Sequence, residues 1–532
     1  PPDALILVPV DDWALRYYLL PQVENLREAL ATVLYLEVDR MSDEEVEALV
    51  SAERQERSTA ALVRWHQGTS DHRGLLDYLL ERAGAQVGVQ HLPGYTVVRY
   101  ALQDKPAPLL IVEQEARFEK LALLRAAIET DVPADDAVAV ALTFNPLDDL
   151  DQDFKVSLEV TDQAGHPLAR QDTLLEDREG EETGEWMAQV PVTTYHILPL
   201  TPGLAPLTYT VDVGVYAEEE PEGLDLLDQA GAPAGKRYVL GSIHLREPSY
   251  QAEEEPDRER LGLVPLSQSP PAEGASAQQL VLAAHSALAE GYDTGQMLDV
   301  LLEWHHVGTS SLPDLRPVLR LVREGVVLAA ESAAPVYGQY PTDRWRPGEV
   351  VLDRRAIQVP LDAAEGPAIV QVVVEGYKPW TLGQIDIHRI ARTFAPPSPK
   401  LGASGRLGEV AELVGYDLAV EAIRAGQEIP LTLYWRALST PDIDYVVFTH
   451  LLSEKGELIA QHDGPPARGT RPTRGWLAGE YILDEHLLEW LKPDYRGVAL
   501  LEVGLYDPAT GTRLLTPEGD SRLLLGNGTM VR

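Results

Sequence analysis

A spacing that occurs three times constrains the fold of this chain more than any other feature of its sequence. In each occurrence an aromatic residue is followed 21 residues later by a glycine, and an alanine comes four residues after the glycine. The three sets are Phe144, Gly165 and Ala169; Trp304, Gly325 and Ala329; and Trp435, Gly456 and Ala460. A repeat at a fixed register indicates that one structural unit recurs, so we expect three copies of one module.

Each copy also contains a Thr-x-x-Trp motif, whose tryptophan lies 20 or 21 residues beyond the glycine. An indole face can stack on a sugar ring, which makes Trp186, Trp345 and Trp476 candidate ligand-binding residues. A residue kept at the same place in every copy also suits an anchor that packs the module's own loop against its core. The fixed register favours packing, and the ligand-binding interpretation stays open.

From Pro106 to the C-terminus, short runs alternate apolar and polar residues and are separated by clusters of Gly, Pro and Asp. Period-two alternation is typical of strands with one buried face, and many such short strands indicate sandwiches. We therefore expect three repeated antiparallel β-sandwich modules of the jelly-roll or immunoglobulin-like kind. Stretches rich in Pro, Glu and Ser predict linkers at 248–277 and 395–404, which leaves modules at 106–247, 278–394 and 405–532.

Residues 1–105 have a different rhythm, in which short apolar runs alternate with helical patterns. This alternation predicts an N-terminal α/β domain with a sheet of parallel type. Ser42 and Glu45 have the spacing of a capping box, which marks the start of a helix. We expect strands at 4–10, 31–38 and 60–65, helices at 12–30, 42–53 and 71–83, and a hairpin at 87–101.

The excess of acidic residues limits the classes of partner. The 532 residues include 84 Asp and Glu against 44 Lys and Arg, which gives a formal net charge of −40. Such a charge repels phosphate backbones and anionic lipid surfaces, so we expect no nucleic-acid partner. The sequence has no cysteine, and no apolar run approaches the roughly 18 residues of a membrane-spanning helix. Because the chain begins at Pro1 rather than Met, we expect a processed piece of a longer product, tied to a membrane only through an upstream segment.

Alternating carboxylates at Asp149, Asp151 and Asp153 resemble a calcium loop, because such a run can place several oxygen ligands around one cation. Phe154 stands where an EF-hand loop needs glycine, so this is not an EF-hand. The third copy has Asp442 and Asp444 at the places of Asp151 and Asp153. A structural calcium site and a solvated acidic turn both fit this pattern.

Motifs of self-contained catalytic sites are missing from the sequence. There is no H-E-x-x-H, no G-x-S-x-G and no P-loop spacing. His196 and His486 each lie ten residues after their tryptophan, without the spacing of metal ligands. Carboxylate pairs are so frequent in this acidic chain that a glycosidase pair cannot be selected from the sequence. We therefore expect this fragment not to be an enzyme and to have no cofactor apart from the candidate calcium.

The third copy carries a family resemblance. Its segments Leu431–Trp435, Tyr445–Leu452, Gly456–Gln461, Pro472–Trp476 and Val503–Pro508 resemble the C-terminal extracytoplasmic part of large Chloroflexi-type membrane glycosyltransferases related to family 39, the dolichyl-phosphate-mannose protein mannosyltransferases. The resemblance extends more weakly over the whole chain. It implies that catalysis belongs to a membrane bundle that this sequence lacks, so no catalytic residue is carried over onto any position here.

Three functions from different classes follow from these observations. The first is a non-catalytic extracytoplasmic region that supports glycan transfer at the cell surface, by binding an acceptor glycan or glycoprotein or by acting as a spacer. The second is a processed structural protein that self-assembles into a filament or a surface layer. The third is a glycan-active enzyme with an unrecognised carboxylate pair, which a perturbed pair in a cleft would support.

Overall fold

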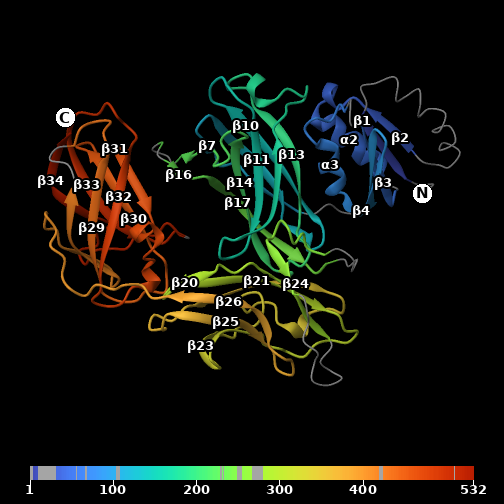
Figure 1. The fold of residues 1–532 in the computed structure, drawn as a ribbon. Helices are drawn as coiled ribbons and strands as arrows, with labels where there is room; N and C mark the ends of the chain where they lie inside the picture. Colours follow the sequence, from blue (N-terminus) through green and yellow to red (C-terminus); the bar gives the residue numbers. More distant parts are fainter. Residues whose placement is uncertain are drawn as a thin grey trace. The chain divides into compact units, whose positions relative to one another are not determined.

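The computed structural model describes residues 4–9, 32–55, 57–65, 69–103, 108–227, 231, 233–248, 255–266, 279–418, 423–508 and 510–531. These residues are mostly β-strands gathered in several sheets, with two α-helices (Figure 1). The chain divides into two compact units. The first unit comprises Pro1–Leu261 with Gly348–Leu352, and the second comprises Gly262–Pro347 with Asp353–Arg532. Among the described residues, no helix is long and apolar enough to span a membrane.

The N-terminal region has the α/β organisation that its sequence predicts. Its elements are β1 (Leu5–Pro9), β2 (Thr32–Leu36), α2 (Asp43–Arg54), β3 (Thr59–Trp65), α3 (Leu75–Glu81), β4 (Gly84–Leu92) and β5 (Tyr95–Leu102). The sheet order is β2-β1-β3-β5-β4. Strand β1 is parallel to β2 and β3, whereas β5 is antiparallel to β3 and β4, so the sheet is mixed rather than purely parallel. The helix expected over 12–30 lies outside the described residues.

The capping box at the start of α2 is confirmed. Ser42 Oγ accepts a hydrogen bond from Glu45 N, and the Glu45 carboxylate accepts one from Ser42 N. Helix α3 is shorter than the predicted 71–83, because Gly74 has a left-handed φ of 77° and the helix begins only after it. Both carboxylate oxygens of Asp71 accept backbone N–H groups of the first turn, from Leu75 and Leu76.

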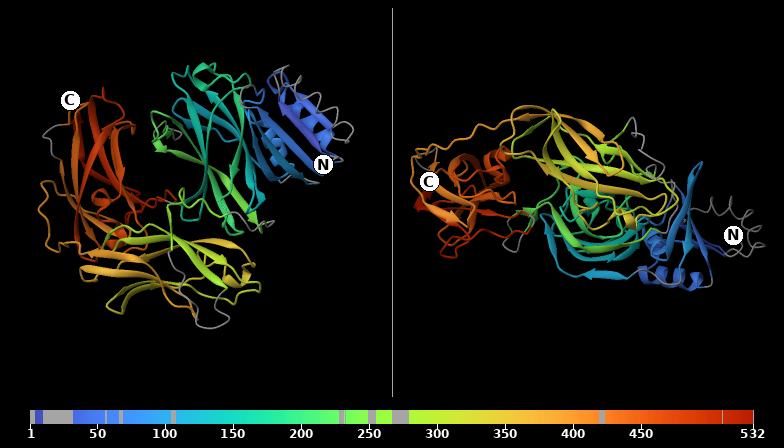
Figure 2. Two further views of the ribbon diagram at one scale, coloured as in Figure 1. Left: turned by 45° about the vertical axis from the view of Figure 1, so that its right-hand side comes forward. Right: turned by 90° about the horizontal axis from the view of Figure 1, so that it is seen from below.

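The first β region has two sheets. Their orders are β13-β10-β8-β7-β15-β16, with β6 beside β8, and β12-β11-β14-β17-β9. Figure 2 shows these strands, coloured teal to green, as two layers. The strands are β6 (Leu109–Val112), β7 (Ala116–Phe118), β8 (Leu121–Glu129), β9 (Asp131–Pro133), β10 (Ala137–Pro146), β11 (Phe154–Thr161), β12 (Pro167–Leu174), β13 (Val192–Pro199), β14 (Thr208–Ala217), β15 (Leu226–Leu227), β16 (Pro233–Gly235) and β17 (Arg237–Arg246).

The second β region also has two sheets, in the orders β18-β19-β21-β24 and β20-β26-β25-β22-β23. Its strands are β18 (Leu263–Pro265), β19 (Leu280–Ser286), β20 (Gly291–Asp293), β21 (Met297–His306), β22 (Val318–Arg323), β23 (Val326–Glu331), β24 (Val350–Gln358), β25 (Gly366–Val373) and β26 (Trp380–His388). Strand β18 lies inside the stretch predicted as a linker over 248–277, so this part of the prediction is wrong: Leu263–Pro265 pairs with β19 and completes a sheet edge.

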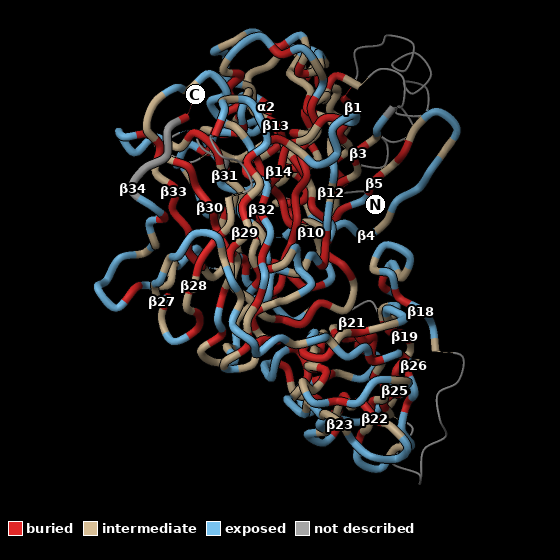
Figure 3. Tube along the Cα trace, turned by 60° about the vertical axis from the view of Figure 1, so that its left-hand side comes forward, coloured by how far each residue is buried: buried red, intermediate tan, exposed pale blue. Residues whose placement is uncertain are grey.

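The third β region has one eight-stranded sheet in the order β27-β28-β29-β32-β31-β30-β33-β34. The strands are β27 (Gly405–Leu407), β28 (Ala411–Leu418), β29 (Ile429–Ala437), β30 (Val446–Ser453), β31 (Leu458–Gly464), β32 (Tyr481–Trp490), β33 (Gly497–Tyr506) and β34 (Leu523–Val531). Buried residues are concentrated along strands such as β30 and β33 (Figure 3). The orders β32-β29-β28 and β31-β30-β33 correspond to β13-β10-β8 and β12-β11-β14 of the first region.

The repeated spacing of the sequence marks the same structural places in all three regions. Phe144, Trp304 and Trp435 are fully buried and pair with Leu123, Leu282 and Leu413, and the register shifts directly beside each of these pairs. Each spacing glycine occupies a hairpin turn with a left-handed φ, of 83° at Gly165, 81° at Gly325 and 79° at Gly456. A side chain is strained at such a φ, which explains why glycine recurs there.

Candidate functional site

The α/β domain and the first β region share a hydrophobic core inside the first compact unit. Leu75 and Leu76 of α3 belong to the same buried cluster as Ala139 and Ala141 of β10. The small alanine side chains of β10 let α3 approach the sheet closely. The loop before α3 is equally close to β13, because a Cβ added to Gly74 would lie 2.8 Å from Tyr195 O. The joint between the two parts is therefore a packed interface.

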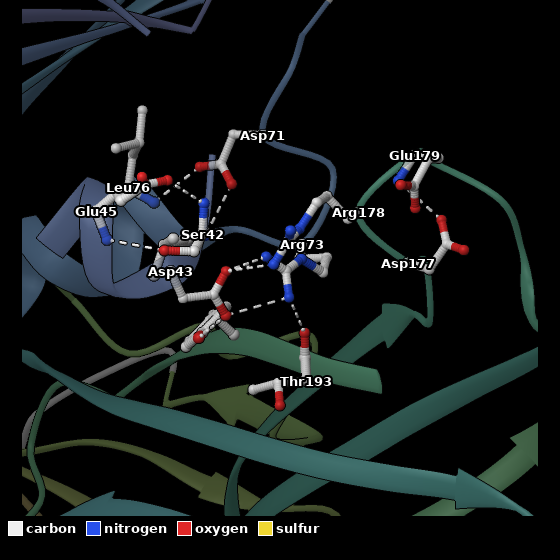
Figure 4. Close-up of polar contacts among 12 residues, drawn as sticks. Ser42, Asp43, Glu45, Asp71, Arg73, Leu76, Asp177, Arg178, Glu179 and Thr193 are labelled. Carbon is white, nitrogen blue, oxygen red and sulfur yellow. Dashed lines mark hydrogen bonds and ion pairs between the residues drawn. The ribbon is translucent and has the colours of Figure 1, made fainter. Parts of the chain in front are cut away.

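A polar cluster centred on Asp43 lies at the edge of this joint (Figure 4). The carboxylate of Asp43, at the start of α2, forms an ion pair with the buried Arg73 and accepts a hydrogen bond of 2.6 Å from Tyr195 Oη. Arg178 Nη2 lies 3.3 Å from Asp43 Oδ1. Arg73 Nη1 also donates to Thr193 O, at 3.1 Å. Two guanidinium groups thus share one carboxylate, beside the positive end of a helix.

Burial and neighbouring positive charges act in opposite directions on the pKa values of Asp43 and Asp71. Burial favours the protonated form of Asp43, but hydrogen bonds from Arg73 and Tyr195 and the charges of Arg73 and Arg178 outweigh it and lower the pKa. The charge of Arg73 also acts on Asp71, but there it does not outweigh burial. Burial raises the pKa of Asp71 to about 6, although the N–H groups of α3 stabilise its charged form. Asp43 therefore stays ionised at neutral pH and holds both arginines.

A pocket of about 410 Å³ opens next to this cluster. Its lining includes the cationic side chains of Arg73 and Arg178. It also includes apolar side chains that are open to solvent, since Met187 is 70% exposed and Val190 is 44% exposed. The full lining is Asp43, Arg73, Asp177, Arg178, Glu179, Glu185, Trp186, Met187, Val190, Pro191, Val192 and Thr193. The pocket thus combines hydrogen-bond donors and carboxylate acceptors with exposed apolar side chains.

The acidic side of the pocket is a rigid turn. Asp177 Oδ1 accepts hydrogen bonds from Glu179 N and Glu181 N, both at 2.9 Å. Asp177 N donates to Glu181 O, also at 2.9 Å. Because its backbone is held in this way, the turn presents Arg178 and Glu179 to the pocket in fixed positions.

The three Thr-x-x-Trp tryptophans are buried, which is at odds with a role as sugar-stacking platforms. Trp186, Trp345 and Trp476 are 4%, 2% and 0% exposed. Each indole N–H donates to a backbone carbonyl five residues earlier, at 2.8–3.1 Å. Their faces are covered by protein, so these residues anchor their own loops. Trp186 is also one of the residues that line the pocket.

The threonine of the Thr-x-x-Trp motif makes the same two backbone hydrogen bonds in each region. Thr183, Thr342 and Thr473 are fully buried. Each hydroxyl accepts a backbone N–H, at 2.7–2.9 Å, and donates to the carbonyl two residues before that N–H group. The hydroxyl therefore ties the start of one strand to the turn that carries the tryptophan.

The candidate calcium ligands do not converge on a common point. Asp153 Oδ1 accepts from Gly184 N, and Asp444 Oδ1 accepts from Arg474 N, so both stabilise a Thr-x-x-Trp turn. Asp151 pairs with Lys120, while Asp149 and Asp442 are exposed. In the described part of the chain, no group of three or more His, Asp or Glu side chains is placed to hold a metal ion. The solvated or capping role fits these five residues better than calcium.

A buried carboxyl pair occurs at the other end of the joint. Glu81, at the end of α3, is hydrogen-bonded to Asp136. Burial, followed by the charge of Asp136, raises the pKa of Glu81 to about 10, and burial raises the pKa of the neighbouring Glu129 to about 7. Glycosidase pairs stand about 5–9.5 Å apart across a sugar. A pair in direct hydrogen-bond contact shares a proton and leaves no room for a glycosidic bond.

Sequence reasoning missed one recurring set of buried polar residues. Asp353 and Asp484, eight residues after their tryptophans, accept the indole N–H of Trp304 and Trp435, at 3.3 and 3.1 Å. The signal in the sequence is a Gly-Glu pair followed by an aspartate after the Thr-x-x-Trp tryptophan of the second and third copies. These residues are Gly348, Glu349 and Asp353, and Gly479, Glu480 and Asp484. The partners of these aspartates lie on strands distant in the sequence, so no local pattern identifies them.

Comparisons with known proteins add no relative. No family model matches the chain, and no curated protein is similar to it.

Proposed function

We propose that this chain is a non-catalytic, extracytoplasmic, multi-module region of a membrane glycosyltransferase-like protein related to family 39, which supports cell-surface glycan transfer by binding an acceptor glycan. In this proposal the three β regions are copies of one sandwich module of the jelly-roll or immunoglobulin-like kind. The shared strand orders, the buried aromatic beside a register shift and the left-handed turn glycines support the repeat.

The pocket beside Asp43 is the single observation that carries the binding role. Saccharides present hydroxyl groups around the rim of a ring and C–H groups on its faces. Arg178 and Glu179 offer a donor and an acceptor for hydroxyls, and the exposed side chains of Met187 and Val190 offer a surface for the C–H groups. Arg178 is suited to this task because its guanidinium has five N–H groups and Asp43 engages only part of them.

The test is a binding titration of the purified chain with neutral and acidic oligosaccharides, first on an array and then by calorimetry. Arg178→Ala and Met187→Ser are expected to weaken binding about tenfold each, which is about 1.4 kcal/mol. Arg117→Ala is the matched control, since Arg117 is an exposed arginine of the same unit, paired with Glu115 and outside the pocket. Binding that all three variants retain would contradict the pocket assignment.

The same preparation separates the alternatives. We expect it neither to transfer sugar from a polyprenyl-phosphate donor nor to cleave glycosides. Turnover that one carboxylate substitution abolishes would overturn the non-catalytic role. Absence of sugar binding, together with contacts between copies that bury more than about 1,000 Å², would favour the structural surface protein.

A further inference from the structure

Two histidines face each other in the third β region. His462 of β31 and His486 of β32 have their Nδ1 atoms 2.9 Å apart, with the rings nearly perpendicular at 74°. His486 Nε2 lies 2.9 Å from Asp484 Oδ2, a close contact between an imidazole and a carboxylate that does not have the geometry of a hydrogen bond. The Asp484 carboxylate in turn accepts the Trp435 indole N–H and, at 2.7 Å, Ala467 N–H. His486 and Asp484 are buried, so this is a polar chain that leads from a half-buried histidine into the core.

The stereochemistry of the pair limits how many protons it can hold. A contact of 2.9 Å between two ring nitrogens is a hydrogen bond only when one nitrogen carries a proton and the other accepts it. With a proton on one Nδ1 only, that ring donates and the other ring, which is neutral, accepts through its bare Nδ1. If both rings are imidazolium, each Nδ1 carries a proton and two N–H groups face each other. The doubly protonated pair is incompatible with this contact.

The pair lies where the two halves of the sheet join. Strands β31 and β32 pair only through Ala460 with Trp490 and Gln461 with Glu489 among the described residues, and His462 directly follows Gln461. The strong pairings of β32 with β29 and of β31 with β30 lie on either side of this seam. The histidine contact therefore lies beside the shortest strand pairing of this sheet among the described residues.

The second β region has the same arrangement with a fixed charge. Asp353 accepts from Trp304 Nε1 and, at 2.8 Å, from Val336 N, which corresponds to Ala467 N in the third region. Arg355 takes the place of His486, with Nε 2.7 Å from Asp353 Oδ2, and its Nη1 lies 2.7 Å from Glu331 Oε2. An arginine stays protonated throughout the physiological range. The second region thus has a permanent ion pair where the third has a titratable pair.

We propose that His462 and His486 form a protonation-sensitive latch that holds the two halves of the third β region together at neutral pH and opens on acidification. The latch is specific to the third region, and the second region is its non-titrating counterpart in the same chain.

The charges around the latch set the direction of the pH dependence. Burial, followed by the charge of His486, lowers the pKa of His462, while Asp463, Asp484 and Glu489 oppose this. A histidine with a lowered folded-state pKa contributes stability above its unfolded pKa of about 6.5, and this stability is lost as the pH falls through the folded value. Acid therefore opens the latch.

The pKa of the neighbouring His450 is shifted in the opposite direction to that of His462. His450 lies 3.3 Å from Asp463 and 3.1 Å from Glu502. Burial lowers its pKa, but these two carboxylates outweigh burial and raise it. Its contribution is present below about pH 6.5 and is lost as the pH rises through the folded value. Arg522 pairs with Glu502 and moderates this effect. His450 cannot account for acid-induced opening.

The test is hydrogen exchange of the full chain between about pH 7.5 and about pH 5, read as protection factors so that intrinsic rates cancel. Protection across β31 and β32 is expected to fall about tenfold or more on acidification, while β23 and β24 keep theirs. The double variant His462→Glu with His486→Arg copies the second region and is expected to remove the pH dependence.

A second variant keeps the test decisive if that double variant does not fold. His462→Gln supplies a side-chain N–H to His486 but does not titrate, so it is expected to flatten the pH response at unchanged protection near neutral pH. His450→Gln is the control and should leave the acid response in place. Equal pH dependence in the second and third regions, or its persistence in His462→Gln, would overturn the proposal.

Discussion

Replacing Thr473 by valine is expected to destabilise the third β region by about 2–3 kcal/mol, although the two side chains have nearly the same shape. Thr473 is fully buried, and its hydroxyl accepts from Tyr445 N at 2.9 Å and donates to Ile443 O at 2.6 Å. Valine leaves both backbone groups without this partner. Each unpaired buried group costs about 1–3 kcal/mol, and because Tyr445 and Ile443 are only half-buried, the lower part of that range applies to each.

Hydrogen exchange over peptides of the third region is the suitable assay, because a chain of several modules does not unfold in one two-state transition. Thr473→Ser is the matched control, since it keeps the hydroxyl and loses one methyl group, at a cost of about 1 kcal/mol. The expected order of stability is wild type, serine, then valine. A valine variant as stable as the wild type, or a serine variant that is worse than valine, would refute the role given to the hydroxyl.

Three further predictions concern other buried groups. Trp476→Ala should cost its region about 3–5 kcal/mol, as truncations of buried aromatics do, and unchanged melting with lost glycan binding would reverse its assignment as an anchor. Asp43→Asn should weaken the joint by about 1–3 kcal/mol because it leaves Arg73 without its charge partner. Limited proteolysis between the α/β domain and the first β region measures this. Glu37→Gln, at a partly exposed residue paired with Arg40, is the control and should have no effect. The raised pKa of Glu129, about 7, means that its contribution to stability is full below its unfolded pKa of about 4.3 and is lost as the pH rises to about 7. Melting temperatures of Glu129→Gln against wild type should therefore diverge across that interval and run parallel above it.

Local patterns in the sequence were sufficient for most of the N-terminal elements. The Ser42 capping box fixed the start of α2, and alternation of apolar residues located β3 and the β4–β5 hairpin. The length of α3 was overestimated because Gly74 was not recognised as a stop, although its left-handed φ ends any helical pattern. The direction of β5 relative to β3 was not accessible, since parallel and antiparallel neighbours have the same apolar alternation.

Long-range contacts explain why the pocket was not found from the sequence. Along the chain, Asp43 is 30 residues from Arg73 and 135 residues from Arg178. Nothing in their local sequence indicates that they are partners. The tryptophans were visible for the opposite reason, because repetition at a fixed register identifies an important position. Repetition does not say whether the indole is covered, and only the packing of the loop against its own strands decides that.

The divergence of the first β region from the other two has a physical basis. Where the second and third regions have Trp and Asp, the first has Phe144 and Thr194. Phenylalanine has no N–H group, so a carboxylate at position 194 would lose its indole donor while remaining buried, a cost of several kcal/mol that protonation would only partly relieve. Thr194 instead hydrogen-bonds His196 at 2.8 Å, and burial lowers the pKa of that histidine to about 4, which keeps it neutral. The loss of the indole N–H and the loss of the buried carboxylate are thus one coupled change. At this place the first region has the neutral Thr194 and His196, the second has the ion pair of Asp353 with Arg355, and the third has Asp484 beside His486.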